Sequence, residues 1–517
     1  MKKLTPLLAR LAAFLPPLAL LAPRLAQAEN TALSTEAPVK TQESATPAGA
    51  AEGANEPQKP APKPETKPEA PKEETYPNGK FEFGSYGRVR VAIDGRGGTG
   101  RSSNIIAYGS RLDEDSYSEF ELRREDTWKK DLKTRVVTTL ALFPPFFHFT
   151  GNPTQSIALR NLYAQTTYGK GNFWVGSRMY RGDDIYLLNF WPLDNQNTVG
   201  GGAGYTLGRG KEGDTMFAFH AGMQRLDNIF QTQSIQAVAP YGFGTVSIPK
   251  VDRPRLIQSY KITHFLRNGP GRTVFDGDDA KGIKLVAYGE THELAAGVQQ
   301  DPLTGKDRAL PSDFGWLAGA EVVYYTGKRD TYAQLFVRHA RGIAAYDPLA
   351  TPTSFSNGYK TSGAHETTVA IAGNVEGETL ALQWGGYLRF FRDASEASSS
   401  LQKFDEGTLV VRPRAYVDDH FGVAVEGSYQ RRRYAVPNAA ATGQLDASVT
   451  RFGLFPFFSP AGRGSFKRPE FRVLYAVSLR DAGARSLYAV GDPFASRSAE
   501  HYLGLSVEWW FNSSSYP

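Results

Sequence analysis

Aromatic and charged side chains recur two residues apart in this sequence. Tyr86 stands two residues before Arg88, and Tyr117 stands two residues before Glu119. An aromatic ring offers an apolar face for stacking, while a guanidinium or carboxylate beside it forms charge-assisted hydrogen bonds. These groups together suit reversible, noncovalent binding.

Residues that catalyse reactions are isolated in this chain. It has no cysteine and eight scattered histidines, which excludes disulfides and Cys-ligated metals. A nucleophile needs an adjacent base, but His420 after Asp418-Asp419 is typical of a solvated loop. Asp113–Asp115 and Asp183–Asp184 offer oxygen ligands for calcium, although solvated loop acids are the simpler interpretation. We therefore expect no enzyme, no cofactor and no metal site.

The paired residues share a face only if the chain is extended, because side chains alternate along a strand. In the first such segment Phe81, Phe83 and Val91 have one parity, while Tyr86 and Arg88 have the other. The last segment repeats this pattern: Leu503, Leu505, Trp509 and Phe511 share one face, while Tyr502, Glu508 and Trp510 share the other. About eighteen segments of this kind are predicted, and the clearest between the two ends are 133–142, 157–168, 214–223, 281–290, 314–327, 330–342, 378–393, 407–418, 420–431 and 470–480.

Two all-β architectures fit so many alternating strands. A soluble sandwich or propeller turns its apolar face inward, whereas a membrane barrel turns it toward lipid and keeps polar residues in the lumen. No propeller-like repeat is present, and mean hydropathy is −0.39, which excludes a helical membrane bundle. Aromatics also gather near strand ends, at 143–149 and 455–458. We predict a transmembrane antiparallel β-barrel, with Trp509 and Phe511 on its lipid side.

The amino-terminal region differs from the rest. Residues 1–28 combine Lys2-Lys3, a short apolar stretch and Ala26-Gln27-Ala28, as in a cleaved secretory signal peptide. Residues 29–78 are rich in Pro, Glu and Lys and cannot bury enough apolar surface to fold, so we expect a disordered periplasmic linker. Residues 79–517 form the predicted barrel. The net charge of +6 is mild for this length and gives no reason to expect nucleic acid.

Several segments resemble the maltoporin-type carbohydrate porins, a family of bacterial outer-membrane sugar porins that includes sucrose-porin relatives. The order and content of the segments carry the resemblance. They are Phe83–Arg88, Arg111–Leu122, Arg160–Tyr163 with Gly176–Tyr186, Phe466–Val473 and Glu508–Phe511. The resemblance implies an eighteen-stranded barrel, a homotrimer in the Gram-negative outer membrane, and facilitated diffusion of maltodextrins or other oligosaccharides.

In this family an aromatic track receives the apolar faces of sugar rings, and charged residues beside it exchange hydrogen bonds with the hydroxyls. The resemblance implies that the aromatic track here consists of Tyr86, Tyr117, Phe466 and Trp510, with Tyr332 as a fifth member. It implies a polar track of Arg88, Glu119, Arg160, Arg178, Arg181 and Asp184. The alternative for each of these aromatics is a structural role in the aromatic girdle at the lipid interface.

The chain departs from the family pattern at several positions, so the sequence does not identify which sugar it would bind. Gly182 stands where the constriction loop carries an Arg, Asn189 where it carries an Asp, and Phe466 where the track carries a Trp. Arginines on the lumen parity also permit an anion- or phosphate-selective pore, or a general diffusion porin. Glutamates on the same faces, such as Glu508, favour a lumen of mixed sign. Expected partners are a sugar, outer-membrane lipid, further copies of the chain, the barrel assembly machinery and, through the linker, peptidoglycan.

Overall fold

The structure is a computed structural model that describes the barrel with a few gaps. The predicted signal peptide (1–28) and the predicted linker up to residue 76 lie outside the described residues, as do Phe146, Phe147 and Phe149. The described residues are 77–143, 156–210, 213–228, 230–267, 279–346, 352, 354–438 and 440–513.

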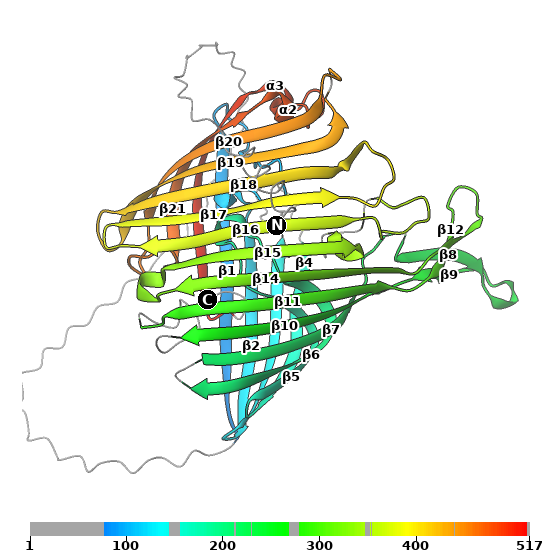
Figure 1. Cartoon of the computed structure of the whole chain (residues 1–517), viewed down its shortest axis with the longest axis horizontal. Coiled ribbons are helices and arrows are strands. Elements are labelled where there is room, and N and C mark those ends of the chain that lie inside the picture. Colours follow the sequence, from blue (N-terminus) through cyan, green and yellow to red (C-terminus); the bar gives the residue numbers. More distant parts are fainter. Residues whose placement is uncertain are drawn as a thin grey trace, which may run out of the picture. The chain divides into compact units, whose positions relative to one another are not determined.

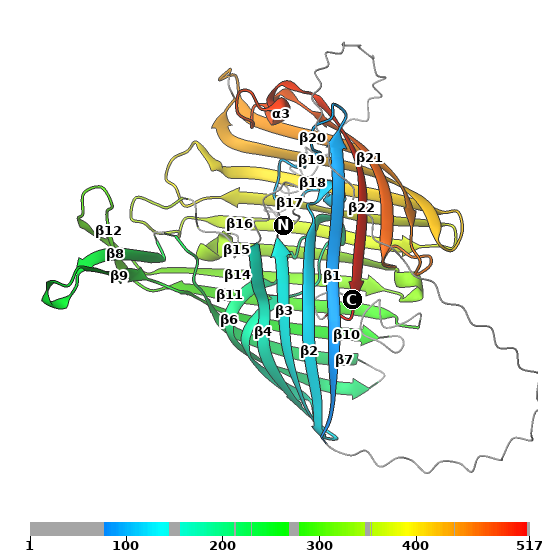
Figure 2. The same ribbon diagram turned by 180° about the vertical axis from the view of Figure 1, so that it is seen from behind.

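Eighteen strands of the described chain form one closed sheet, which confirms the predicted barrel. Each barrel strand pairs antiparallel with the next one in chain order, and the last strand pairs with the first, as Figures 1 and 2 show. The barrel strands are β1 (Asn78–Asp94), β2 (Tyr117–Lys129), β3 (Leu132–Phe143), β4 (Ser156–Tyr168), β5 (Gly171–Arg181), β6 (Asn195–Gly210), β7 (Gly213–Gln224), β10 (Arg255–Arg267), β11 (Gly282–Leu294), β14 (Asp313–Tyr325), β15 (Tyr332–Gly342), β16 (His365–Glu376), β17 (Leu380–Arg392), β18 (Ser400–Tyr416), β19 (Phe421–Pro437), β20 (Gln444–Phe458), β21 (Glu470–Arg480) and β22 (Ala499–Phe511).

The remaining elements are short and belong to loops. Two hairpins lie outside the barrel sheet, and Figure 1 shows them at one end of the barrel. These elements are β8 (Thr232–Val238), β9 (Thr245–Asp252), β12 (Gly297–Gln300), β13 (Asp307–Leu310), α2 (Ala482–Arg485), α3 (Pro493–Ser496), η1 (Arg111–Asp113), η3 (Tyr186–Leu188), η4 (Pro240–Gly242), η5 (Lys328–Asp330) and η6 (Ile343–Ala345). Among the described residues, no helix is both long enough and apolar enough to cross a membrane.

The two ends of the barrel differ in the length of their connections. Two-residue turns join β2 to β3 and β4 to β5, whereas thirty residues separate β7 from β10. In bacterial outer-membrane barrels the short turns face the periplasm and the long loops face outward. The start of β1 and the end of β22 both lie at the short-turn end.

Apolar side chains cover the outer surface of the barrel. Phe83 and Val91 of β1 are 46% and 67% exposed, while Tyr86 on the opposite parity is 1% exposed. This is the reverse of a soluble sandwich and fits a lipid-facing exterior. Phe511 is exposed on the outer parity, as predicted.

The aromatics at the end of β20 are only partly a lipid girdle. Phe455 and Phe457 are buried on the inner parity. The Arg412 guanidinium carbon lies 5.4 Å from the Phe455 ring centre, and that of Arg414 lies 4.1 Å from Phe457. The phenylalanines therefore cover buried arginines, which their type alone does not predict.

A loop between β5 and β6, residues 182–194, enters the barrel and narrows it. We call it the constriction loop. Ile185, Leu187 and Phe190 are buried in a cluster that includes Tyr387 of the opposite wall. A Cβ at Gly385 of β17 would lie 2.7 Å from the Ile185 side chain, so glycine there makes room for the loop. The loop is thus fixed to the wall by apolar packing.

Candidate functional site

The five predicted aromatic-track residues lie along one line inside the barrel. β1 pairs with both β2 and β22, and this register sets Tyr86 opposite Trp510. The ring centres of Tyr86 and Tyr117 are 6.0 Å apart. Farther along, the rings of Phe466 and Tyr332 are 6.2 Å apart. Strands from both ends of the chain therefore build one aromatic surface.

Tyr186 of η3 joins the two halves of this line, although it was not among the predicted track residues. Its ring centre lies 6.0 Å from that of Trp510 and 5.5 Å from that of Phe466. Its hydroxyl donates to Glu508 Oε2 at 2.6 Å and accepts a hydrogen bond from Arg468. Tyr186 lies in a loop, where strand parity gives no signal, so only its position two residues after Asp184 could have indicated it.

The outer part of the aromatic track is covered. Tyr86 is almost fully buried and Tyr117 is 7% exposed. The Tyr86 hydroxyl accepts hydrogen bonds from Arg88 at 2.8 Å and from Arg111 of η1 at 2.7 Å. The cavity beside Arg88, Tyr186 and Glu508 has a volume of only about 30 Å³, room for about two water molecules. A ligand as large as a sugar ring would fit here only if side chains of η1 and of the constriction loop moved.

Three predicted polar-track residues lie directly beside these rings. The Arg88 guanidinium carbon is 5.2 Å from the Tyr117 ring centre, and Arg88 pairs with Glu114 at 2.9 Å. Arg160 pairs with Glu119 at 2.5 Å. Ion pairs thus lie beside Tyr86 and Tyr117, so a hydroxylated ligand would find donors and acceptors next to these two rings.

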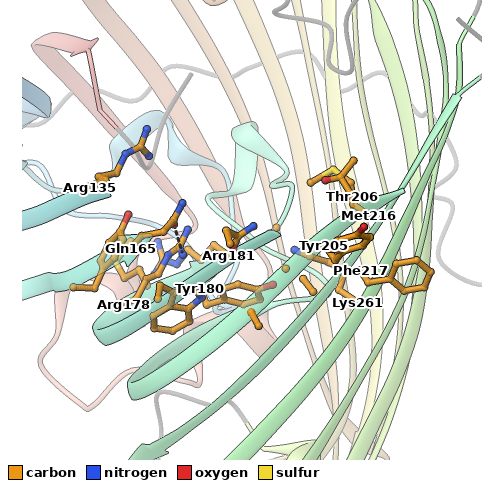
Figure 3. A pocket seen from close by; sticks show the side chains of 18 of the residues that line it. Arg135, Gln165, Arg178, Tyr180, Arg181, Tyr205, Thr206, Met216, Phe217 and Lys261 are labelled. Carbon is orange, nitrogen blue, oxygen red and sulfur yellow. Dashed lines mark hydrogen bonds between the residues drawn. The ribbon is translucent and has the colours of Figure 1, made fainter. Parts of the chain in front are cut away.

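Arg178 and Arg181 line a separate cavity, shown in Figure 3. The Arg178 guanidinium carbon lies 4.7 Å from the ring centre of Tyr163, and that of Arg181 lies 4.0 Å from Trp191. The structure therefore does not bring these two arginines into the line of five predicted aromatics.

Asp184 lies in the constriction loop. Its backbone oxygen accepts a hydrogen bond from Gln334 Nε2 at 2.6 Å. Burial raises the pKa of its carboxyl to about 6, with Arg111 opposing this shift and Asp183 adding to it. The carboxyl therefore titrates near neutral pH.

Four of the five acids considered for calcium form ion pairs, namely Asp113, Glu114, Asp115 and Asp183. Asp113 accepts from Arg451 Nη1 at 3.0 Å, and Asp183 pairs with Lys284. Glu508 is surrounded by Arg111 at 3.2 Å, Arg468 at 3.0 Å and Arg472 at 3.0 Å. The described lumen is of mixed sign, as the strand parity predicted.

A closed eighteen-stranded barrel with an apolar exterior, a polar interior and an inward-folded loop defines an outer-membrane porin, a channel protein. The chain belongs to the LamB porin family, whose model matches residues 81–511. The maltoporin of Vibrio cholerae serotype O1 is 24% identical in an alignment 457 positions long, which covers 83% of this chain and 94% of the relative.

Solved outer-membrane barrels are more distant in sequence. The channel DcaP of Acinetobacter baumannii is 10% identical with a TM-score of 0.41, and the match covers 83% of this chain and 97% of DcaP. In-vitro folded OmpT of Vibrio cholerae is 11% identical with a TM-score of 0.37, covering 84% and 98%.

Proposed function

We propose that this porin is sugar-selective and lets oligosaccharides diffuse down their gradient along the aromatic track, without catalysis. The observation that carries the proposal is the line of six rings from Tyr117 to Tyr332, joined through Tyr186. Sugar rings have apolar faces, and stacked aromatic surfaces receive them. Membership of a family with maltoporin relatives makes maltodextrins the first candidates.

The polar track would supply the hydrogen bonds that a sugar loses on leaving water. Arg88, Glu119 and Arg160 lie next to Tyr117. Such contacts must be weak and repeated so that the solute can leave as well as enter. The ion pairs suit this role, because a sugar hydroxyl can replace one charged partner in a hydrogen bond while the other remains in place.

We place the channel in the outer membrane as a homotrimer, exported by the signal peptide of residues 1–28 and inserted by the barrel assembly machinery. The linker of residues 29–78 would extend into the periplasm, where peptidoglycan is its expected partner. The apolar outer surface, with side chains such as Val91 and Leu505 exposed, supports direct contact with lipid.

Single-channel conductance in a planar bilayer tests the proposal. Maltodextrins, sucrose and inorganic phosphate are titrated in turn against the purified full-length protein. Saturable block by a sugar is expected, in three steps for a trimer. A strong anion preference with block by phosphate alone would support an anion-selective porin instead, and an open channel indifferent to all three would indicate a general diffusion porin.

A further inference from the structure

A second cavity lies between the base of the constriction loop and the short-turn end of β4 to β7. Its volume is about 400 Å³, and residues from Gly182 and Trp191 of the loop to Thr206 of β6 line it (Figure 3). Small-molecule sites typically have volumes of about 300–1,000 Å³. This cavity therefore has room for a sugar unit, which the cavity beside Tyr186 lacks.

Glycines on the inner face of β6 make room for two side chains that line the cavity. A Cβ on Gly202 would lie 2.5 Å from the Trp174 indole nitrogen, and one on Gly204 would lie 2.6 Å from the Asn172 side chain. The indole and the amide therefore occupy the volume that β6 leaves empty. The bare backbone of β6 forms the rest of the wall.

Aromatic rings form one side of the cavity. Tyr180 is stacked with Trp174 at 6.3 Å and 19° and with His220 at 5.2 Å and 13°. Tyr180 is only half-buried, whereas Trp174 and His220 are fully buried. The Lys261 ammonium lies 4.9 Å from the centre of the Tyr180 ring, so a sugar would meet the exposed part of this ring beside a cation.

Cations dominate the rest of the lining. Arg135, Arg178, Arg181 and Lys261 border the cavity, and none of the described residues lining it is acidic. Arg135 pairs with Glu125 at 2.7 Å and Lys261 with Asp194 at 2.6 Å. These pairs direct part of the positive charge away from the cavity.

Aromatic rings rather than a carboxylate hold Arg178. Its guanidinium carbon lies 4.7 Å from the Tyr163 ring centre and 5.1 Å from that of Trp174. Its hydrogen bond to Gln165 is long, at 3.4 Å, and no acidic partner occurs among the described residues. A guanidinium on aromatic faces keeps its planar N–H fork for a bidentate acceptor.

We propose that this cavity binds an acidic sugar, a pyranose carrying a carboxylate or phosphate. Arg178 receives the anionic group in a bidentate contact, Lys261 adds positive charge, and the sugar ring lies on Tyr180. The inference rests on the proposed function, because it adds an acidic-sugar site to a channel whose aromatic track takes neutral sugars.

The test compares current block by glucuronate, glucose, glucose 6-phosphate and inorganic phosphate in planar bilayers of the full-length protein. Arg178→Gln should weaken block by glucuronate and glucose 6-phosphate at least about tenfold, the loss expected for one charge-assisted contact. Block by maltodextrins should weaken much less, because Arg178 lies outside the line of aromatics. Arg225→Gln is the matched control, since Arg225 is an exposed arginine outside the barrel strands.

A second variant separates the ring from the charge. Tyr180→Leu should weaken glucuronate block while leaving the weaker block by inorganic phosphate unchanged. Glucuronate and glucose 6-phosphate differ in their anionic group, so their relative block shows which acid the cavity prefers.

Two results would overturn the inference: equal glucuronate block in wild type and Arg178→Gln, or inorganic phosphate blocking as strongly as glucose 6-phosphate. Failure of the proposed function is a separate result, namely wild-type channels that maltodextrins do not block. Unchanged open-channel conductance of each variant shows that the barrel has folded.

Discussion

The sharpest prediction concerns Tyr186, because one substitution removes the hydrogen bonds that hold its ring across the aromatic track. Its hydroxyl bonds to two charged partners, Glu508 and Arg468. A hydrogen bond to a charged group contributes about 1.5–3 kcal/mol. The two together hold the ring across the track with on the order of 3 kcal/mol, which leaves it displaced in about one molecule per hundred.

Tyr186→Phe removes both hydrogen bonds and keeps the ring. Glu508 remains paired with three arginines, so the surrounding network persists. If a sugar enters only when the ring moves aside, the association rate of maltodextrins should rise between about ten- and a hundredfold. Ion conductance should rise much less, because ions and water pass smaller openings.

Current-fluctuation analysis of maltodextrin block measures association and dissociation rates separately. Tyr260→Phe is the matched control, because it removes the hydroxyl of an exposed tyrosine on the outer face of β10. An association rate that is unchanged in Tyr186→Phe, with normal conductance, would refute the reasoning that Tyr186 limits entry.

Three further predictions concern the track, the loop and the barrel wall. Tyr117→Ala should weaken sugar block several-fold while changing ion conductance little, as current titration would show; equal loss of both, or of neither, argues against stacking. Asp184 is neutral at pH 5 and charged at pH 7, since its pKa is raised to about 6, so the cation-to-anion permeability ratio from reversal potentials should rise over this range and rise less in Asp184→Asn. Glu470→Gln leaves Arg414 buried without its carboxylate and should lower the free energy of unfolding by about 3 kcal/mol. Urea unfolding in detergent measures this difference. Equal stability of the wild type and the variant would contradict a structural role for the pair.

The barrel was predictable because lipid and lumen impose opposite demands on alternate residues. The strand predicted at residues 470–480 has the bounds of β21, since apolar and polar residues alternate along it between the lipid face and the lumen face. The grouping of Tyr86, Tyr117 and Trp510 follows from the closure of the barrel, which pairs the first strand with the last. A period of two therefore predicts both the fold and part of the candidate site.

Loops and long-range packing lay beyond that rule. Tyr186 and Arg111 cover the aromatic track from loops, where no periodicity reports which way a side chain points. The Trp174 indole that lines the cavity at Arg178 packs over Gly202 of the neighbouring strand. A glycine adds nothing to the hydrophobic pattern, so the sequence does not indicate this packing. Phe457 faces inward because it covers Arg414, a partner some forty residues away in sequence.

The buried ion pairs of the barrel wall increase the relative contribution of Arg178 to the electrostatic potential that a solute meets. Arg412 pairs with Glu426 at 2.6 Å, and Arg451 binds Asp113. Each pair cancels its own field over a few ångströms, so most of the described wall is close to neutral at the distance of a passing solute. Because Arg178 is held by rings instead of a carboxylate, a solute in its cavity would feel its charge. Selectivity for an acid group would therefore be local to one cavity, and a channel of nearly balanced overall charge could still distinguish an acidic sugar from a neutral one.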